Sequence, residues 1–168
     1  MAGTQSFDIT TGCDLQEVDN AINQAMKEIR QRYDFKGLSV SVDFKRAENK
    51  LVLRAPDEFK LRAVWDVIQE KMVRRHVPLK NLQQGDSMPA AGGTVVQEVN
   101  LQQGIPIETA RAIVKFIKGL RIKKVQAEIQ KEQVRVSSPS RDNLQTAMKQ
   151  VKEQEFGVEL NFGNYRSS

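Results

Sequence analysis

The densest run of basic side chains in the sequence is KFIKGLRIKK, at residues 115–124. Arg121, Lys123 and Lys124 end this run, after a helix-forming stretch and at the start of a strand-forming one. Cations at this density attract phosphate groups by charge. They are equally suited to a solvated helix end, where the helix dipole favours positive charge. The run predicts either a phosphate contact or a plain helix terminus.

The segment SSPSRDN, at residues 137–143, places an arginine beside a helix start. Ser140 is a residue type that commonly caps helices. Arg141 would then lie next to backbone N–H groups that can hold a phosphate. A cap without any ligand explains the same residues equally well. We therefore expect a helix to start here and treat Arg141 as a candidate phosphate ligand.

The segment RYDFKG, at residues 32–37, brings two aromatic rings together in a chain with 6% aromatic residues. One interpretation is a clasp between helix and strand, with Phe35 packed beneath the strand and Tyr33 partly buried. Gly37 would then supply a backbone shape that other residues resist. The other interpretation is a ligand groove, with the rings as its wall and Arg32 and Lys36 beside it.

Two more arginines are placed by strand phase. Arg54 in LVLRA and Arg135 in QVRVSS fall on the outward phase of their strands, at what we take to be corresponding places in the two halves. Guanidinium groups suit both a guanine edge and a phosphate. The candidate nucleotide-binding residues are Arg32, Lys36, Arg54, Arg121, Lys123, Lys124, Arg135 and Arg141.

Signatures of catalysis and of metal binding are missing from the sequence. Cys13 is the sole cysteine and His76 the sole histidine, which disfavours metal sites and Cys–His couples. The sequence contains no GxxxxGK[ST] loop and no GxGxxG motif after a strand. The acidic residues form no recognisable catalytic pair. We therefore expect a protein that is not an enzyme and that has no metal and no cofactor.

Hydrophobic periodicity predicts the same order of elements twice, strand–helix–strand–strand–helix–strand. The first set comprises segments 6–10, 14–33, 38–44, 51–55, 57–75 and 77–82. The second set comprises segments 94–101, 106–119, 124–130, 133–138, 140–154 and 157–162. This order is typical of an α+β fold with two tandem ferredoxin-like domains, each with an antiparallel sheet covered by helices on one face. Residues 51–68 also align with 134–151 at an offset of 83, which indicates duplication.

Composition marks the expected domain boundaries. Residues 83–93, rich in Gly, Pro, Ala and Gln, are predicted to be a linker between domains at 1–82 and 94–168. The sequence leaves open whether strand 6–10 pairs within the first domain or crosses to the second. The outward positions of the predicted strands carry no aromatic residue, so the base-stacking platform of RNA-recognition domains is not favoured.

Charge and cysteine usage bear on the kind of partner and on the cellular location. The 168 residues carry a net charge of +5, with 14 basic and 13 acidic residues in 1–90 and 12 basic and 8 acidic in 91–168. This basic bias is compatible with a phosphate-bearing partner. One cysteine, no secretory signal and no long apolar run predict a cytoplasmic protein without a membrane segment.

Several segments in order along the chain resemble the YajQ family of small bacterial cytoplasmic proteins. They are FDI, LQEVDNA, RYDFKG, LQQGI, KVQAEIQ, VRVSS, SRDNLQ and LNFGNYR. The resemblance implies two ferredoxin-like domains and nucleotide binding, with GTP and transfer RNA as ligands of some members and cyclic di-GMP as the ligand of others, which affect transcription. It implies no enzymatic activity. This chain has SSPSRDN where a Gly-Lys pair is more usual, so it lacks that lysine.

These observations lead to one functional expectation and two alternatives. We expect a non-enzymatic protein that binds a guanine nucleotide, cyclic di-GMP or GTP, and acts in signalling. One alternative is binding of transfer RNA or another RNA. The other is a protein-interaction module that regulates transcription through a transcription regulator.

Overall fold

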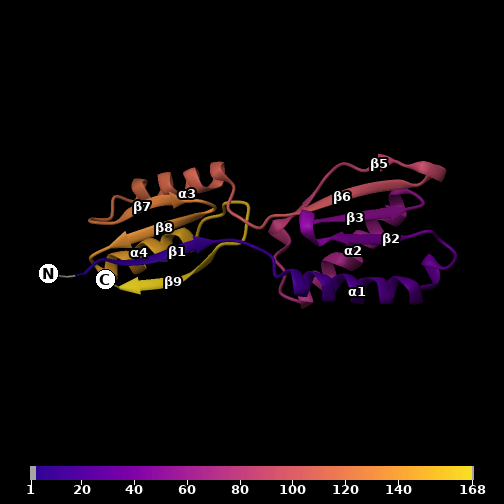
Figure 1. The fold of residues 1–168 in the computed structure, drawn as a ribbon, viewed down its shortest axis with the longest axis horizontal. Coiled ribbons are helices and arrows are strands. Elements are labelled where there is room, and N and C mark those ends of the chain that lie inside the picture. Colours follow the sequence, from indigo (N-terminus) through magenta and orange to yellow (C-terminus); the bar gives the residue numbers. More distant parts are fainter. Residues whose placement is uncertain (1–2, 168) are drawn as a thin grey trace. The chain divides into compact units, whose positions relative to one another are not determined.

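The computed structural model describes residues 3–167, which form two antiparallel sheets with helices on one face of each (Figure 1). The predicted α+β class with two ferredoxin-like domains is confirmed. The chain divides into two compact units. The inserted unit is Cys13–Gln103, and the split unit combines the residues up to Gly12 with those from Gly104 onward.

The inserted unit has a sheet of order β2-β3-β6-β4, and a short strand β5 also pairs with β6. Two long helices, α1 and α2, contribute most of its core against this sheet. Its elements are α1 (Leu15–Gln31), β2 (Ser41–Lys45), β3 (Lys50–Ala55), α2 (Glu58–Arg74), β4 (Leu82–Gln84), β5 (Met88–Pro89) and β6 (Val95–Leu101). Short 3-10 turns connect them, among them η1 (Tyr33–Phe35).

The split unit repeats the arrangement with the order β7-β8-β1-β9. Helices α3 and α4 supply the apolar residues that cover its sheet. Its elements are β1 (Gln5–Thr10), α3 (Ile107–Gly119), β7 (Gln126–Gln130), β8 (Gln133–Ser138), α4 (Arg141–Lys152) and β9 (Asn161–Ser167). In both units the two strands before the second helix form a hairpin at one side of the sheet.

The two repeats exchange one strand. Strand β1 precedes α1 in the chain, yet it pairs with β8 and β9 of the split unit. Strand β6 precedes α3, yet it pairs with β3 and β4 of the inserted unit. Phe7 and Ile9 of β1 are fully buried among the apolar residues of the split unit. The question left open by the sequence is thereby answered, because strand 6–10 crosses to the second repeat.

The observed division differs from the predicted boundaries. Residues 83–93, expected as a linker, lie inside the inserted unit, where β4 and β5 both pair with β6. The backbone N–H of Gly85 donates to Glu98 O at 2.8 Å, and that of Ala90 donates to Thr94 O at 2.8 Å. Gly92 and Gly93, with φ of 72° and 75°, lie in the turn between β5 and β6, and Pro89 belongs to β5, so the segment is not a flexible spacer. Each hydrophobic core is confined to one unit.

The RYDFKG segment forms a clasp in which one ring is buried and the other is exposed. Phe35 is 4% exposed, as predicted, and Gly37 adopts a φ of 75°, which favours glycine. The predicted burial of Tyr33 is wrong, since this side chain is 88% exposed. Helix α1 ends at Gln31, and the 3-10 turn that follows takes Tyr33 off the buried helical face.

Two features are absent from the residues that the structure describes. No helix within 3–167 has both the length and the apolar character needed to cross a membrane. The same residues contain no group of three or more His, Cys, Asp or Glu side chains arranged to hold a metal ion.

Candidate functional site

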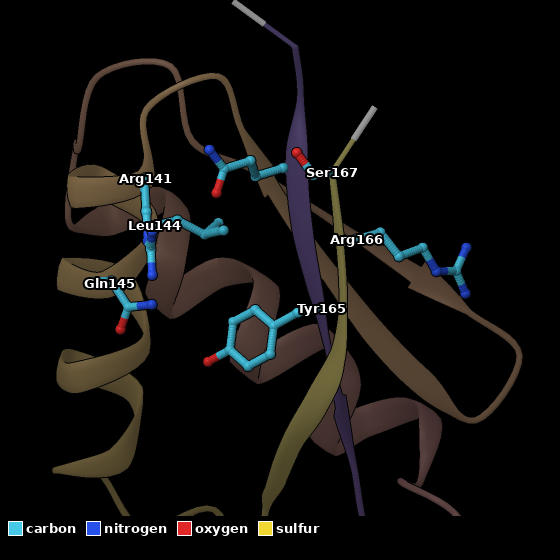
Figure 2. A pocket seen from close by; sticks show the side chains of 7 residues that line it. Arg141, Leu144, Gln145, Tyr165, Arg166 and Ser167 are labelled. Atoms are coloured by element: carbon cyan, nitrogen blue, oxygen red, sulfur yellow. The ribbon is translucent and has the colours of Figure 1, made fainter.

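A pocket of about 290 Å³ lies between α4 and β9 in the split unit (Figure 2). We call it the α4–β9 pocket. It combines an aromatic ring, an apolar wall, amide groups and arginines. Its lining residues are Gln5, Arg141, Leu144, Gln145, Tyr165, Arg166 and Ser167.

The capped start of α4 positions the helical side of this pocket. The Ser140 side chain accepts a hydrogen bond from Asn143 N at 3.2 Å, as the sequence predicts. Ser138, which is 1% exposed, accepts one from Ser140 N at 3.0 Å. These bonds fix Arg141 as the first helical residue and place Gln145 one turn later on the same face. Figure 2 shows both side chains beside the pocket, with Leu144 directed toward the strands.

Tyr165 forms the aromatic side of the pocket. Its ring centroid lies 6.1 Å from that of Phe7, and its hydroxyl donates to Met148 Sδ at 3.2 Å. The side chain nevertheless remains 57% exposed. In Figure 2 the ring lies between β9 and α4, on the side where Arg141 and Gln145 lie. An exposed ring held by packing on one side is a surface on which a nucleobase can stack.

Arg166 contributes to the pocket lining, but its guanidinium points away from Tyr165 toward the other side of the sheet (Figure 2). There it lies 3.8 Å from Asp8 Oδ2. Asp8 is 3% exposed, and Arg135 Nε donates to its Oδ1 at 2.9 Å. The hydrogen bond from Arg135 is the main cause that holds the pKa of Asp8 below its ordinary value. Arg135, a candidate ligand from the sequence, is thus engaged in an ion pair.

A second hollow of about 280 Å³ lies at the end of β8. We call it the Ser137–Pro139 hollow. Its lining is polar apart from Pro139 and comprises Thr4, Lys124, Gln126, Ser137, Ser138 and Pro139. Asn143 Nδ2 donates to Lys123 O at 2.9 Å, which ties the basic turn to the first turn of α4.

The structure thus brings together two basic segments that are separate in the sequence. Lys123, Lys124 and Arg141 all lie around the start of α4, and Arg121 is an exposed residue of the same turn as Lys123. Consecutive residues line the two hollows: Gln5 lines the α4–β9 pocket and Thr4 lines the Ser137–Pro139 hollow. Four of the eight candidates from the sequence therefore belong to one region of the split unit.

The candidates in the inserted unit do not converge on one hollow. Arg32 binds Asp34 at 2.9 Å and lies 5.0 Å from the Phe35 ring centroid. The hydrogen bond to Asp34 is the main cause that raises the pKa of Arg32. Lys36 is exposed at the end of η1, and Arg54 is exposed on β3 opposite Ser41 of β2.

The supposed correspondence of Arg54 and Arg135 is wrong. Arg54 pairs with Ser41, the first residue of β2, whereas Arg135 pairs with Glu128, the third residue of β7. The residue of the split unit that matches Arg54 is Ser137, which pairs with the first residue of β7. The sequence alignment at an offset of 83 also matches Arg54 with Ser137.

Sequence reasoning missed Gln5, Gln145 and Tyr165. The last strand was expected at 157–162, whereas β9 runs from Asn161 to Ser167. A register shift between β1 and β9 places Phe162 and Tyr165 on the same side, and both rings contact Phe7, at 6.0 and 6.1 Å. Strict alternation would have put residues three apart on opposite faces. The aromatic residues of LNFGNYR were the available signal.

Known proteins of one family match this chain over almost its whole length. The family model described as nucleotide-binding protein YajQ-like matches residues 5–166. A nucleotide-binding protein of Solibacter usitatus is 47% identical over 163 residues, which cover 97% of this chain and 98% of the relative. A nucleotide-binding protein of Carboxydothermus hydrogenoformans is 46% identical over 166 residues, which cover 99% of this chain and 100% of the relative. A chain matched from end to end at this identity belongs to the family of YajQ-like nucleotide-binding proteins.

Proposed function

We propose that this protein binds a guanine nucleotide in the α4–β9 pocket, with cyclic di-GMP as the first candidate, and that it acts in signalling. The observation that carries the proposal is the exposed ring of Tyr165 beside Arg141 and Gln145. Base stacking, phosphate pairing and edge recognition each need one of these residue types, and the pocket holds all three.

Each group of the pocket has a specific task in this proposal. The base stacks on Tyr165, which contributes roughly 1–3 kcal/mol per base in comparable sites. The guanidinium of Arg141 either pairs with a phosphate or donates to guanine O6 and N7. The amide oxygens of Gln5 and Gln145 are acceptors for the N–H groups on the Watson–Crick edge of guanine.

The volume of the pocket bears on whether the ligand has one nucleotide unit or two. A volume of about 290 Å³ is at the low end for small-molecule sites and suits one nucleotide moiety. The Ser137–Pro139 hollow, with about 280 Å³ and Lys124 at its edge, offers space for phosphate or a second base. Cyclic di-GMP has two bases and two phosphates, so it is the ligand that uses both hollows.

Isothermal titration calorimetry with cyclic di-GMP, and with GTP in parallel, tests the proposal. We expect saturable binding of cyclic di-GMP that weakens roughly tenfold in Tyr165→Ala and in Arg141→Ala, because one stacking or one charged contact is lost. Arg62→Ala is the matched control, since Arg62 is an exposed arginine of α2 outside both hollows. Unchanged affinity in the first two variants, or no heat from either nucleotide, would reject this site.

RNA binding is the second candidate, favoured by the exposed basic residues Arg121, Lys123 and Lys124 beside the start of α4. Phosphate contacts make RNA affinity fall steeply with salt. A titration of transfer RNA at two salt concentrations separates the candidates: RNA binding predicts a steep fall that is reduced in Lys123→Ala/Lys124→Ala. A signalling role further predicts that the nucleotide changes affinity for a protein partner such as a transcription regulator.

A further inference from the structure

A third hollow lies in the inserted unit, and neither the nucleotide proposal nor the RNA alternative uses it. It has a volume of about 220 Å³ and lies between the second half of α1, η1 and the start of β2. We call it the α1–β2 groove. Apolar side chains predominate in its lining, which comprises Met26, Ile29, Arg30, Phe35, Leu38, Val40, Ser41 and Val42.

The groove borders a strand that has an open edge. Strand β2 is the end strand of its sheet and pairs with β3. An edge strand offers backbone N–H and C=O groups to an added strand from another chain. Val40 and Val42 pack partly against the core, and both also line the groove. Backbone pairing along β2 would therefore turn every second side chain of an added strand toward the sheet face on which the hollow lies.

The surplus charge at the groove is positive. Arg30 lines it, and Lys36 lies between the lining residues Phe35 and Leu38. Both cations are exposed, and within residues 3–167 no acidic side chain forms an ion pair with either of them.

The acidic side chains of α1 and η1 next to the groove are already neutralised, and Asp43 of β2 lies on the opposite face of its strand from the lining residue Val42. Asp34 is bound by Arg32 at 2.9 Å and lies 3.9 Å from Lys60 Nζ. Glu28 is bound by Lys71 Nζ at 3.0 Å. Arg30 and Lys36 are therefore cations without an acidic partner in the inserted unit, and acidic groups on an incoming protein would form ion pairs with them.

Exposed apolar side chains surround the same turn. Tyr33 is 88% exposed and Leu38 is 39% exposed. Phe59, which is 74% exposed, lies on the other side of Lys60, whose Nζ is 5.8 Å from its ring centroid and 5.1 Å from that of Phe35. Exposed aromatic rings beside a hollow are typical anchors of protein interfaces.

We propose that the α1–β2 groove binds an extended acidic and apolar segment of a partner protein, which adds as a strand along β2. One apolar side chain of the segment enters the hollow, and flanking Asp or Glu residues pair with Arg30 and Lys36. A second copy of this chain is disfavoured as the occupant, because it would bring the same cations together. A nucleic acid is disfavoured because, among the lining residues, only Arg30 and Ser41 carry side-chain donors for phosphate.

A peptide selection against the full chain tests this proposal. A random library of displayed peptides, each roughly twelve residues long (about 40 Å when extended), is panned on the immobilised protein, and selected peptides are then titrated by fluorescence anisotropy. We expect sequences with alternating apolar residues and net negative charge. Binding should weaken at least tenfold in Arg30→Glu and in Leu38→Asp. Lys115→Glu, a charge reversal at an exposed residue of α3 outside the groove, should leave affinity unchanged.

A charge exchange makes the test specific to the groove. A selected peptide with its acidic residues replaced by lysine should lose binding to the native protein and recover it with Arg30→Glu. Because Arg30 is exposed, this variant should fold even if Leu38→Asp does not. Neutral or basic selected peptides, equal binding to Arg30→Glu, or no enrichment would overturn the proposal. So would competition for the selected peptide by transfer RNA, or light scattering that shows dimers broken by Arg30→Glu.

Discussion

At the scale of single residues, Asp8 connects three strands of the split unit through one carboxylate. It lies on β1, and its partners Arg135, Asn164 and Arg166 come from the neighbouring strands β8 and β9. The carboxylate is 3% exposed, so these donors replace water almost completely. Asp8 therefore stabilises the fold on the sheet face opposite the candidate site, which is consistent with a structural task for Arg135.

The Asp8 network predicts a pH-dependent stability. The pKa of Asp8 is held below its ordinary value in the folded state, so its stabilisation is present above that ordinary value and is lost as pH falls through the folded-state pKa. Asp8→Asn should cost the split unit about 2 kcal/mol at pH 7, since a buried charged hydrogen bond is removed. The difference in the free energy of unfolding between the native protein and Asp8→Asn should become smaller below about pH 4.

Urea unfolding of both proteins at pH 7 and at low pH measures this effect. Asp43→Asn is the matched control, because Asp43 is an exposed aspartate on β2. A constant difference between native protein and Asp8→Asn across the pH range would contradict a stabilising charge at Asp8.

Cys13 supplies a second prediction at this scale. Burial raises the pKa of its thiol to about 11, and its side chain is 7% exposed. Only the thiolate reacts with disulfide reagents, so the folded protein should react slowly at pH 8 and the urea-unfolded protein promptly. Ser39→Cys, at an exposed position of the inserted unit, should react at once in the folded state. Equal rates for the two cysteines would show that Cys13 is accessible.

At the scale of elements, periodicity predicted the helices and most strands, because these depend on local patterns of apolar residues. The strand expected at 77–82 is wrong, since Leu79–Asn81 form a 3-10 turn and β4 begins at Leu82. The capping residue Ser140 was also readable, since caps act within three residues. The pairing partners of β1 were not readable, because sheet partners are chosen by packing across the whole chain. Tyr165 was missed for a similar reason, as the register shift beside β9 is set by its neighbour β1.

Helix α4 allows stability and binding to be separated by a pair of cap variants. Ser140→Ala and Asp57→Ala each remove a side-chain cap, from α4 and α2 respectively, and each should cost about 1 kcal/mol. Only Ser140→Ala should also weaken nucleotide binding, because the cap fixes the start of the helix that carries Arg141. Thermal melting and calorimetric titration of both variants check this. Equal nucleotide affinity in the two variants would show that the start of α4 is not part of the site.

At the scale of the whole molecule, the exchanged strands make one unit an insertion into the other. Cys13–Gln103 is continuous in the chain, and its ends are held together by one side chain. Cys13 N donates to Gln103 Oε1 at 2.8 Å, and Gln103 Nε2 donates back to Cys13 O at 3.1 Å. Duplicated sequences therefore did not predict the domain boundaries, because the structural unit and the sequence repeat are offset by one strand.

This architecture predicts that the inserted unit is removable. Its core residues all lie between Cys13 and Leu101, and those of the split unit all lie outside that range. Because the ends of the inserted unit are adjacent, a flexible linker of about five Gly and Ser residues should replace Cys13–Gln103 and still join β1 to α3. Residues 13–103 alone should also unfold cooperatively in urea, since they contain a complete sheet and both covering helices.

The shortened protein also tests where the nucleotide binds. All lining residues of the α4–β9 pocket and of the Ser137–Pro139 hollow belong to the split unit, so the shortened protein should bind cyclic di-GMP within about threefold of the full chain, a difference of about 0.7 kcal/mol. Circular dichroism first establishes that it is folded, and calorimetry then gives the affinity. A folded shortened protein that binds no nucleotide, beside a full chain that does, would place essential contacts in the inserted unit. If the shortened protein does not fold, the Tyr165→Ala variant of the full chain decides the same question, because the stacking surface for the base is then absent while the inserted unit is intact.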